Sequence, residues 1–347
     1  MSAGFLLGLS ELHIQTQAFY NQKILAQRGD FFADLKIERL SVDYALLEGV
    51  PAWKDVAGRL LKQNPEFIFA NTFQRDGIAK WLTQFGLPIL GVVHNPDILK
   101  LSDHAMSLVA QGKVFAYGLA PHVVEKITRT IPELEGRCAV YHPVFWMRPE
   151  DDLFAPTPNC RRIFLAGAVD YKNRDFERLV AFLARDGLQT DIPVVFQVCT
   201  GGPDRKRLEQ DIADFGLQRF FELAPLDPQT GRVPHAVYLH SLRSCDAVMP
   251  LLPQERKDYL FNKYSTAIAA GIGSMRPIIA PKIYGEVYGF PALEPALHDP
   301  VDISALDLSM PRLLAVRAEM KAIWTRAMAE NQVAIAQGLA ALGLRAS

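Results

Sequence analysis

The sequence predicts an α/β protein made of two doubly wound domains, with a ligand site in the cleft between them. Two observations support this. Short apolar strand signals alternate with amphipathic helix signals, and this alternation stops at residues 147–159 and restarts at 161. The chain of 347 residues is also longer than one ordinary hydrophobic core requires. Ligands of doubly wound domains bind beyond the carboxyl ends of the strands.

In the first half, short apolar runs bounded by turn residues predict strands, and apolar residues at helical spacing predict helices. The expected strands cover 4–9, 65–72, 87–95, 113–118 and 138–146. The expected helices cover 14–29, 77–86 and 121–132. Residues 87–95 are almost continuously apolar, which is typical of a strand buried on both faces of a parallel sheet. Together these elements predict an N-terminal domain over 1–146.

Residues 147–159 carry three prolines and an acidic run, a composition that fits a linker. The second half then repeats the alternation and predicts a domain over 160–323. Its expected strands cover 163–166, 192–202, 219–226, 247–252 and 276–281. One expected helix begins at Phe176, and the others cover 205–217, 238–246 and 264–273. The tail, residues 311–343, reads as a long helix with one break at most.

Composition excludes several classes of protein. The formal net charge of −1 offers no electrostatic basis for binding nucleic acid. The four cysteines are scattered, so neither a zinc site nor a disulfide framework is expected, and a reducing compartment fits. The N-terminal residues lack a basic segment, and no run of about 18 apolar residues occurs. We therefore expect a cytoplasmic protein without a secretory signal or transmembrane segment.

The first strand of the second half leads through Gly167 into a loop with Asp170, Lys172 and Arg174. A strand that turns through a glycine into a helix exposes unpaired N–H groups, which suit an anion. The loop matches neither the P-loop pattern nor the dinucleotide fingerprint. Taken alone, Lys172 is more often a solvated lysine than a ligand-binding one.

Four segments of the second half resemble, in order and spacing, the nucleotide-binding half of GT-B glycosyltransferases, which have two Rossmann-like domains. These segments are 163–183, 194–226, 239–252 and 264–280. The likeness is closest to the retaining members that use nucleoside-diphosphate sugars. It implies that Lys172 holds the donor diphosphate. The arginine that usually precedes this lysine is absent, because Ala168 follows Gly167, and Arg174 is the candidate replacement.

The resemblance also suggests a nucleotide site. Thr200, Gly201 and Gly202 correspond to the glycine turn that lets the nucleotide approach the backbone, and Ala224, Pro225 and Leu226 correspond to the loop that contacts the base. Taken singly, each piece is ordinary α/β turn chemistry.

Residues 257–280 resemble the helix that carries the Glu-x7-Glu pattern of the family. Asp258 takes the place of the first Glu, which contacts the donor sugar, and Thr266 replaces the second, which binds the ribose. A threonine hydroxyl bonds a ribose more weakly than a carboxylate does. Lys263, Ser265 and Thr266 at a helix start would instead suit a phosphate.

The likeness is looser in the first half. His94 falls where many members place a histidine facing the donor sugar, with Asp97 as a candidate orienting partner; the alternative is a histidine satisfied at a strand end. The resemblance also implies that the last helix, about 324–347, packs back on the N-terminal domain. Basic residues at 126–137 would either touch lipid headgroups or form a solvated face.

The expected function is therefore a metal-independent glycosyltransferase of hexosyltransferase type, without cofactor, acting in polysaccharide or glycoconjugate assembly. It would move a sugar from a nucleoside-diphosphate sugar to a glycan, lipid-linked or protein acceptor. Two alternatives remain. A non-catalytic GT-B-like protein would bind a nucleotide or a partner glycosyltransferase, and would show donor binding without transfer. A sugar-nucleotide epimerase would convert the donor sugar without an acceptor.

Overall fold

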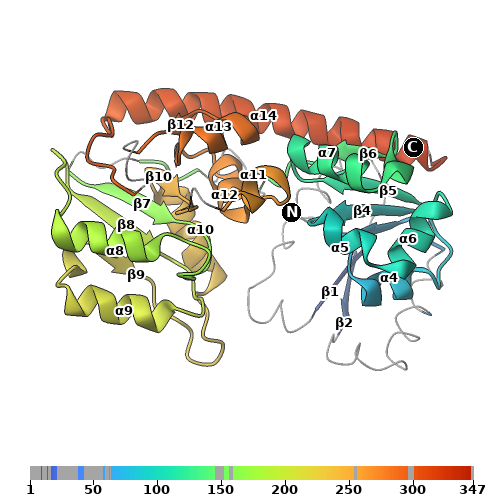
Figure 1. The fold of residues 1–347 in the computed structure, drawn as a ribbon, viewed down its shortest axis with the longest axis horizontal. Helices are drawn as coiled ribbons and strands as arrows, with labels where there is room; N and C mark the ends of the chain where they lie inside the picture. Colours follow the sequence, from blue (N-terminus) through green and yellow to red (C-terminus); the bar gives the residue numbers. More distant parts are fainter. Residues whose placement is uncertain are drawn as a thin grey trace. The chain divides into compact units, whose positions relative to one another are not determined.

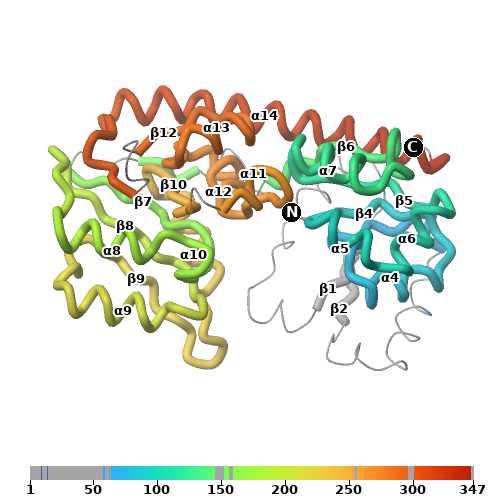
Figure 2. The backbone as a smooth tube through the Cα atoms, in the orientation of Figure 1, coloured from blue at the N-terminus to red at the C-terminus, as the bar shows by residue number. Residues whose placement is uncertain are grey.

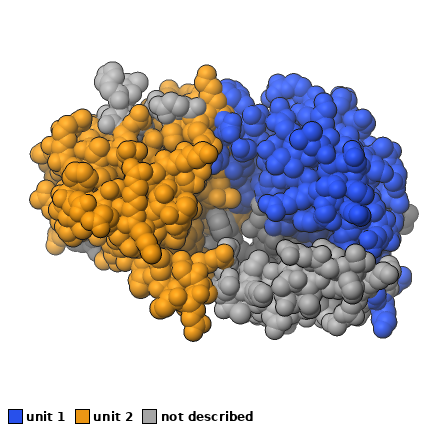
Figure 3. Space-filling view, turned by 60° about the horizontal axis from the view of Figure 1, so that its bottom comes forward, with its two compact units in different colours: residues 1–143, 258–264, 327–347 blue, residues 144–257, 265–326 orange. Residues whose placement is uncertain are grey.

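The computed structural model describes residues 9, 14, 17–21, 38–42, 58, 62, 64–144, 152–155, 159–253, 256–295 and 301–344. The chain divides into two compact units, coloured separately in Figure 3. Unit 1 contains Met1–Pro143, Asp258–Tyr264 and Ala327–Ser347, and unit 2 contains Val144–Lys257 and Ser265–Arg326. Both are built on parallel sheets, which confirms the predicted α/β fold.

Unit 1 has a four-stranded parallel sheet in the order β3-β4-β5-β6 (Figure 1). Its strands are β3 (Ile68–Ala70), β4 (Ile89–Val93), β5 (Val114–Gly118) and β6 (Cys138–Val140). Its helices include α4 (Asp76–Leu82), α5 (Pro96–Lys100), α6 (Asp103–Ala110) and α7 (Pro121–Thr130), followed by a 3-10 turn, Pro132–Leu134. A separate parallel pair joins β1 (Gln17–Asn21) to β2 (Glu38–Val42).

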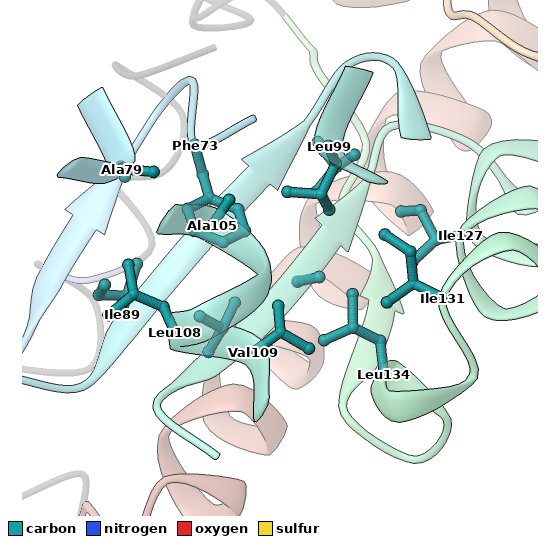
Figure 4. Packing of buried hydrophobic residues seen from close by; sticks show 14 of the residues in the cluster. Phe73, Ala79, Ile89, Leu99, Ala105, Leu108, Val109, Ile127, Ile131 and Leu134 are labelled. Atoms are coloured by element: carbon teal, nitrogen blue, oxygen red, sulfur yellow. The ribbon is translucent and has the colours of Figure 1, made fainter. Parts of the chain in front are cut away.

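Both faces of the unit 1 sheet are covered by helices, and successive strand residues point to opposite faces. Ile89 and Val93 of β4 pack against helices α4 to α7, in the cluster shown in Figure 4. Leu90 and Val92 pack on the other face with Ile335 from the C-terminal helix. Full burial of β4 and β5 explains their continuous apolar runs.

Unit 2 has a six-stranded parallel sheet in the order β12-β11-β10-β7-β8-β9. Its strands are β7 (Arg161–Leu165), β8 (Val194–Val198), β9 (Phe221–Leu223), β10 (Ala247–Met249), β11 (Ile278–Ile279) and β12 (Ala292–Leu293). Its helices are α8 (Phe176–Arg185), α9 (Arg205–Asp214), α10 (His235–Ser244), α12 (Thr266–Gly273) and α13 (Lys282–Tyr288), with a 3-10 turn at Gln218–Phe220.

The strand order of unit 2 creates a topological switch point. From β7 the chain adds β8 and β9 on one side, then crosses to add β10, β11 and β12 on the other. The loops that follow β7 and β10 therefore leave the sheet side by side but turn in opposite directions. Ligands of open α/β sheets bind at such a point.

One long helix, α14 (Met310–Ala341), contributes to both units and can be followed in Figure 2. It is continuous, so the break that the sequence allowed is not present. Its residues from Ala327 onward belong to unit 1, where Gly338 lies against the ring of Tyr117. A Cβ at Gly338 would lie 2.4 Å from the Tyr117 hydroxyl, so only glycine lets the helix approach the sheet this closely.

Several expectations need correction. The helix expected over 14–29 is wrong, because β1 occupies Gln17–Asn21 and pairs with β2. A pairing partner distant in sequence overrode the helical pattern here. The strand expected over 4–9 lies almost wholly outside the described residues. Helices α5 and α6 were not predicted from the sequence. Residues 258–264, expected within the second domain, belong to unit 1.

The described part of the linker is attached to unit 2 by a buried ion cluster. Asp152 accepts from Arg276 at 2.6 Å and also pairs with Arg317 of α14. Both guanidinium groups lie over the ring of Phe154, 4.9 and 4.6 Å from its centre. Arg276 is fully buried, and its pKa is lowered chiefly by desolvation.

Candidate functional site

The loops that follow β7 and β8 are joined into one structure. Thr200 donates its hydroxyl to the carbonyl of Gly167 at 2.7 Å. The N–H of Val169 donates to the carbonyl of Gly201 at 3.0 Å. These bonds fasten the expected diphosphate loop to the expected nucleoside loop, which sequence reasoning treated as separate pieces.

Gly202 is the point of closest approach between these loops. A Cβ there would lie 2.2 Å from the carbonyl oxygen of Val169, closer than any real contact. Just beyond it, the N–H of Asp204 donates to the carbonyl of Val169 at 3.1 Å. The carboxylate of Asp204 accepts from the N–H of Tyr171 at 2.7 Å. The start of α9 therefore supports the loop that carries Lys172.

Lys172 has a fixed backbone and an exposed side chain. Its N–H donates to Asp170 at 3.0 Å, and its carbonyl accepts from Arg256 at 3.4 Å. No partner of its ammonium group is found among the described residues. Hydrogen bonds from Asn173 lower the pKa of Asp170, so this carboxylate stays ionised and keeps the turn closed. Lys172 is thus an exposed cation on a fixed turn.

Arg256 follows β10, whereas Lys172 follows β7, so these two cations come from the two loops of the switch point. Sequence reasoning missed Arg256, because only the strand order places residue 256 beside residue 172. The same neighbourhood is held together by the N–H of Asp175, which donates to the carbonyl of Leu251 at 2.9 Å.

Arg174 lies differently from what the sequence suggested. Its side chain is 7% exposed and donates to the carbonyl of Pro250 at 2.7 Å. The guanidinium lies under Gly167, whose φ of +101° and lack of a side chain allow this approach. A group that is buried on a main-chain carbonyl is not presented to a diphosphate as an exposed clamp would be. The Arg174 side chain instead packs against Gly167 and supports the loop from the protein interior.

The expected nucleoside loop comes close to the glycine turn. A Cβ at Gly201 would lie 3.0 Å from the carbonyl of Gly231 and 3.9 Å from the side chain of Leu226. Buried Arg205 donates to the carbonyls of Thr200 and Ala224 at 3.0 Å each. Arg205, which sequence reasoning also missed, therefore ties the ends of β8 and β9 together just before exposed Pro225.

The start of α12 is the next element of unit 2 at these strand ends. Its Ala267 packs in one cluster with Ala166, Cys199 and Ala224, the residues that directly follow β7, β8 and β9. The hydroxyl of Ser265, which precedes the helix, is buried and has no hydrogen-bond partner among the residues that the structure describes. Thr266 is exposed at the first helical position. This helix start presents N–H groups that are unpaired within the helix.

Asp258 and Lys263 belong to unit 1, not to the unit that carries Ser265 and Thr266. They pair with each other, with 3.0 Å between the ammonium and the carboxylate. The ring of His122 donates to the carbonyl of Lys263 at 3.2 Å, which fastens this segment to α7.

His94 directly follows β4, and its hydrogen-bond partners determine which ring nitrogen carries the proton. Its Nε2 lies 2.9 Å from the carbonyl of Asn71, which only accepts, so Nε2 carries hydrogen and Nδ1 has the lone pair in the neutral ring. The backbone N–H of His94 donates to the side-chain oxygen of buried Gln74 at 2.7 Å. Burial lowers the pKa of His94, which keeps the ring neutral near pH 7. Asp97, suggested as its orienting partner, pairs instead with Lys126 at 3.1 Å.

Two features are absent from the residues that the structure describes. No group of three or more His, Cys, Asp and Glu side chains is placed to hold a metal ion. No helix there is long and apolar enough to cross a membrane.

Comparison with known proteins gives a clear result only at the level of structure. No protein family matches the sequence, and no curated protein does. HepE from Anabaena, in complex with UDP and glucose, has a TM-score of 0.64 at 13% identity, covering 99% of this chain and 96% of that one. Its complex with UDP-glucose scores 0.62 at 14% identity, with 98% and 96% coverage. A glycosyltransferase from Rickettsia africae scores 0.58 at 12% identity, with 98% and 96% coverage. The chain therefore has the GT-B fold of these glycosyltransferases, with two Rossmann-like domains.

Proposed function

We propose that this protein is a glycosyltransferase that takes a sugar from a nucleoside-diphosphate sugar. The observation that carries the proposal is Lys172 at the switch point of unit 2, whose backbone is held on both sides while its ammonium is exposed and unpaired among the described residues. A preorganised cation at this place suits the diphosphate of a nucleotide donor.

The chemistry requires stabilisation of a leaving group. Negative charge builds on the diphosphate as the bond between sugar and phosphate breaks. Lys172 and the N–H groups at the start of α12 would balance this charge, and exposed Thr266 at that start has a hydroxyl that could bond a phosphate oxygen. The proposal therefore needs no metal, and transfer should withstand a chelator. Half-buried Arg256, which donates to the Lys172 carbonyl, is a second cation for this role.

The remaining roles follow from the two units. Gly201, Gly202, Pro225 and Leu226 would contact the nucleoside mainly through main-chain atoms. His94 would accept a hydrogen bond from a sugar hydroxyl through the lone pair on Nδ1, because Nε2–H is already engaged with Asn71. In unit 1, Asp258 would contact the donor sugar as the family likeness implies.

The structural neighbours support a nucleotide-sugar donor, since HepE was solved with UDP and with UDP-glucose. The acceptor is proposed as a glycan, a lipid-linked intermediate or a protein. A lipid-linked acceptor would require contact with a membrane surface in the cytoplasm, for which Lys126 and Arg129 on α7 are candidates.

The experiment is a thermal-shift titration with UDP, GDP, ADP, CMP and their common sugars. It compares the wild type with Lys172→Ala and with Lys282→Ala, an exposed lysine of unit 2 that pairs with Glu286. One nucleotide should stabilise the wild type and the Lys282 variant. For Lys172→Ala its affinity should fall about 10- to 100-fold, the range for losing a hydrogen bond to a charged group.

The outcomes separate the alternatives. A shift with none of the nucleotides would refute the donor site and favour a protein without transferase activity. A shift that Lys172→Ala leaves intact would show that the diphosphate lies elsewhere. Conversion of the donor sugar without any acceptor would identify an epimerase.

A further inference from the structure

The ring of Tyr171 has three defined contacts with neighbouring side chains. Its hydroxyl donates to Asp211 at 2.5 Å. The guanidinium of Arg207 lies 4.0 Å from the ring centre on one side. The ring of Phe176 stacks on it with 5.9 Å between centres and an angle of 18°. The side chain immediately before Lys172 is therefore fixed by one hydrogen bond and two ring contacts.

Most of these contacts come from one face of α9. Asp204, Arg207 and Asp211 are spaced three and four residues apart, so they lie in a row along the helix. Asp204 accepts a hydrogen bond from the backbone N–H of Tyr171, Arg207 lies over its ring, and Asp211 accepts a hydrogen bond from its hydroxyl.

We propose that Tyr171 is a positioning residue, and that the row Asp204–Arg207–Asp211 acts through it to present Lys172 to the donor diphosphate. This inference rests on the proposed function. Helix α9 belongs to the βα unit that follows β8, whereas Lys172 follows β7. The neighbouring unit therefore determines how well the lysine is aimed, although none of the three side chains of the row is proposed to touch the ligand.

The electrostatics of the row suit a support rather than a ligand site. Arg207 lies 3.3 Å from Glu177 and 3.9 Å from Asp211, so its charge is already balanced. Burial and the bond to Asp211 raise the pKa of Tyr171, so the phenol stays protonated and remains a donor. The Lys172 ammonium thus stays the exposed cation of this loop while the groups behind it are paired.

The test changes Asp204, because its side chain makes no capping bond to α9 and its carboxylate supports the Tyr171 N–H. The probe is whichever of UDP, GDP and ADP binds the wild type most tightly, with its nucleoside as a phosphate-free control. Asp204→Ala should weaken the diphosphate about tenfold, because affinity falls with the fraction of molecules that hold the competent conformation. It should leave the affinity of the nucleoside unchanged.

Three further variants make the test specific. Asp204→Asn keeps an acceptor oxygen and should restore most of the affinity. Asp214→Ala, which removes an exposed carboxylate elsewhere on α9 that pairs with Gln210, should have no effect. In a Lys172→Ala background, Asp204→Ala should weaken the diphosphate no further, since both changes act on one interaction. If Asp204→Ala does not fold, Tyr171→Phe, which removes only the bond to Asp211, should still weaken the diphosphate about threefold.

The results distinguish this inference from the proposed function. If no nucleoside diphosphate binds the wild type, both fail. If binding depends on Lys172 but Asp204→Ala and Tyr171→Phe bind like the wild type, the positioning role alone is refuted. Additive effects in the double variant, or equal losses for the diphosphate and the nucleoside, also overturn it, because Asp204 would then act on general stability.

Discussion

Replacing Gly202 by alanine tests the contact on which the whole candidate site depends. The added Cβ would lie 2.2 Å from the carbonyl oxygen of Val169, and 2.5 Å from its nitrogen. Ordinary contacts begin at 3.4 Å, so one loop would have to move by about 1 Å or more. The obstacle is backbone, which has no rotamer that could relieve the clash.

The expected cost follows from that movement. Overpacking of this kind costs about 1–3 kcal/mol. The two bonds that cross the contact, from Val169 to Gly201 and from Asp204 to Val169, contribute about 0.5–1.5 kcal/mol each if both are lost. Gly202→Ala should therefore destabilise unit 2 by about 2–6 kcal/mol. It should also abolish most of the nucleotide affinity, because the loops that carry Lys172 and Gly201 would separate.

Urea unfolding would measure the loss of stability, and hydrogen exchange of the native protein would localise that loss to unit 2. The amides of Val169 and Asp204 should exchange faster in the variant. Gly77→Ala is the matched control, since a Cβ there meets nothing within 4 Å and the residue lies in α4. It should be neutral or stabilise by about 0.5–1 kcal/mol. If Gly202→Ala keeps the wild-type midpoint and the protection of both amides, the two loops are not in the contact described.

Three further changes probe other parts of the chain. Asp152→Ala leaves the buried guanidinium of Arg276 and the half-buried one of Arg317 without their carboxylate and should destabilise unit 2 by about 3–5 kcal/mol in urea unfolding; Asp186→Ala, which removes an exposed ion pair, should have no measurable effect, and equal effects would contradict the burial argument. Gly338→Ala should push α14 from the ring of Tyr117, cost about 1–3 kcal/mol and speed hydrogen exchange in the last turns of the helix; unchanged exchange there would refute this. The pKa of His94 is lowered by burial, so below its ordinary value of 6.5 the unfolded chain binds the proton first and stability falls as the pH drops. His94→Gln should remove that part of the pH dependence of Tm, and an identical slope in both proteins would count against a neutral buried ring.

Elements with strong local signals were predicted well from the sequence. The strands expected at 87–95 and 113–118 correspond to β4 and β5. They could be predicted because a strand buried on both faces has a continuous apolar run. The helix that begins at Phe176 is α8, whose apolar residues recur at helical spacing. Pairing between residues far apart in sequence has no such local signal, and this explains the error at Gln17–Asn21.

The residues of the candidate site likewise include some that a local sequence pattern predicts and others that it does not. Gly167, Lys172, Gly201 and Gly202 could be found from the sequence, since a strand, a glycine turn and a helix follow one another along the chain. The buried position of the Arg174 side chain could not be predicted, because the carbonyl that accepts its hydrogen bond is 76 residues away in the sequence.

The sequence by itself determined the α/β class, the alternation of strands and helices, and the glycine loops that suit an anion, because each depends on the order and type of neighbouring residues. Only the tertiary structure decided which loops meet. It joined Gly167 to Thr200, set Arg256 beside Lys172 and assigned residues 258–264 to unit 1. The physical reason is that strand order and long-range hydrogen bonds depend on how buried faces pack, and the local pattern of residues does not encode that packing.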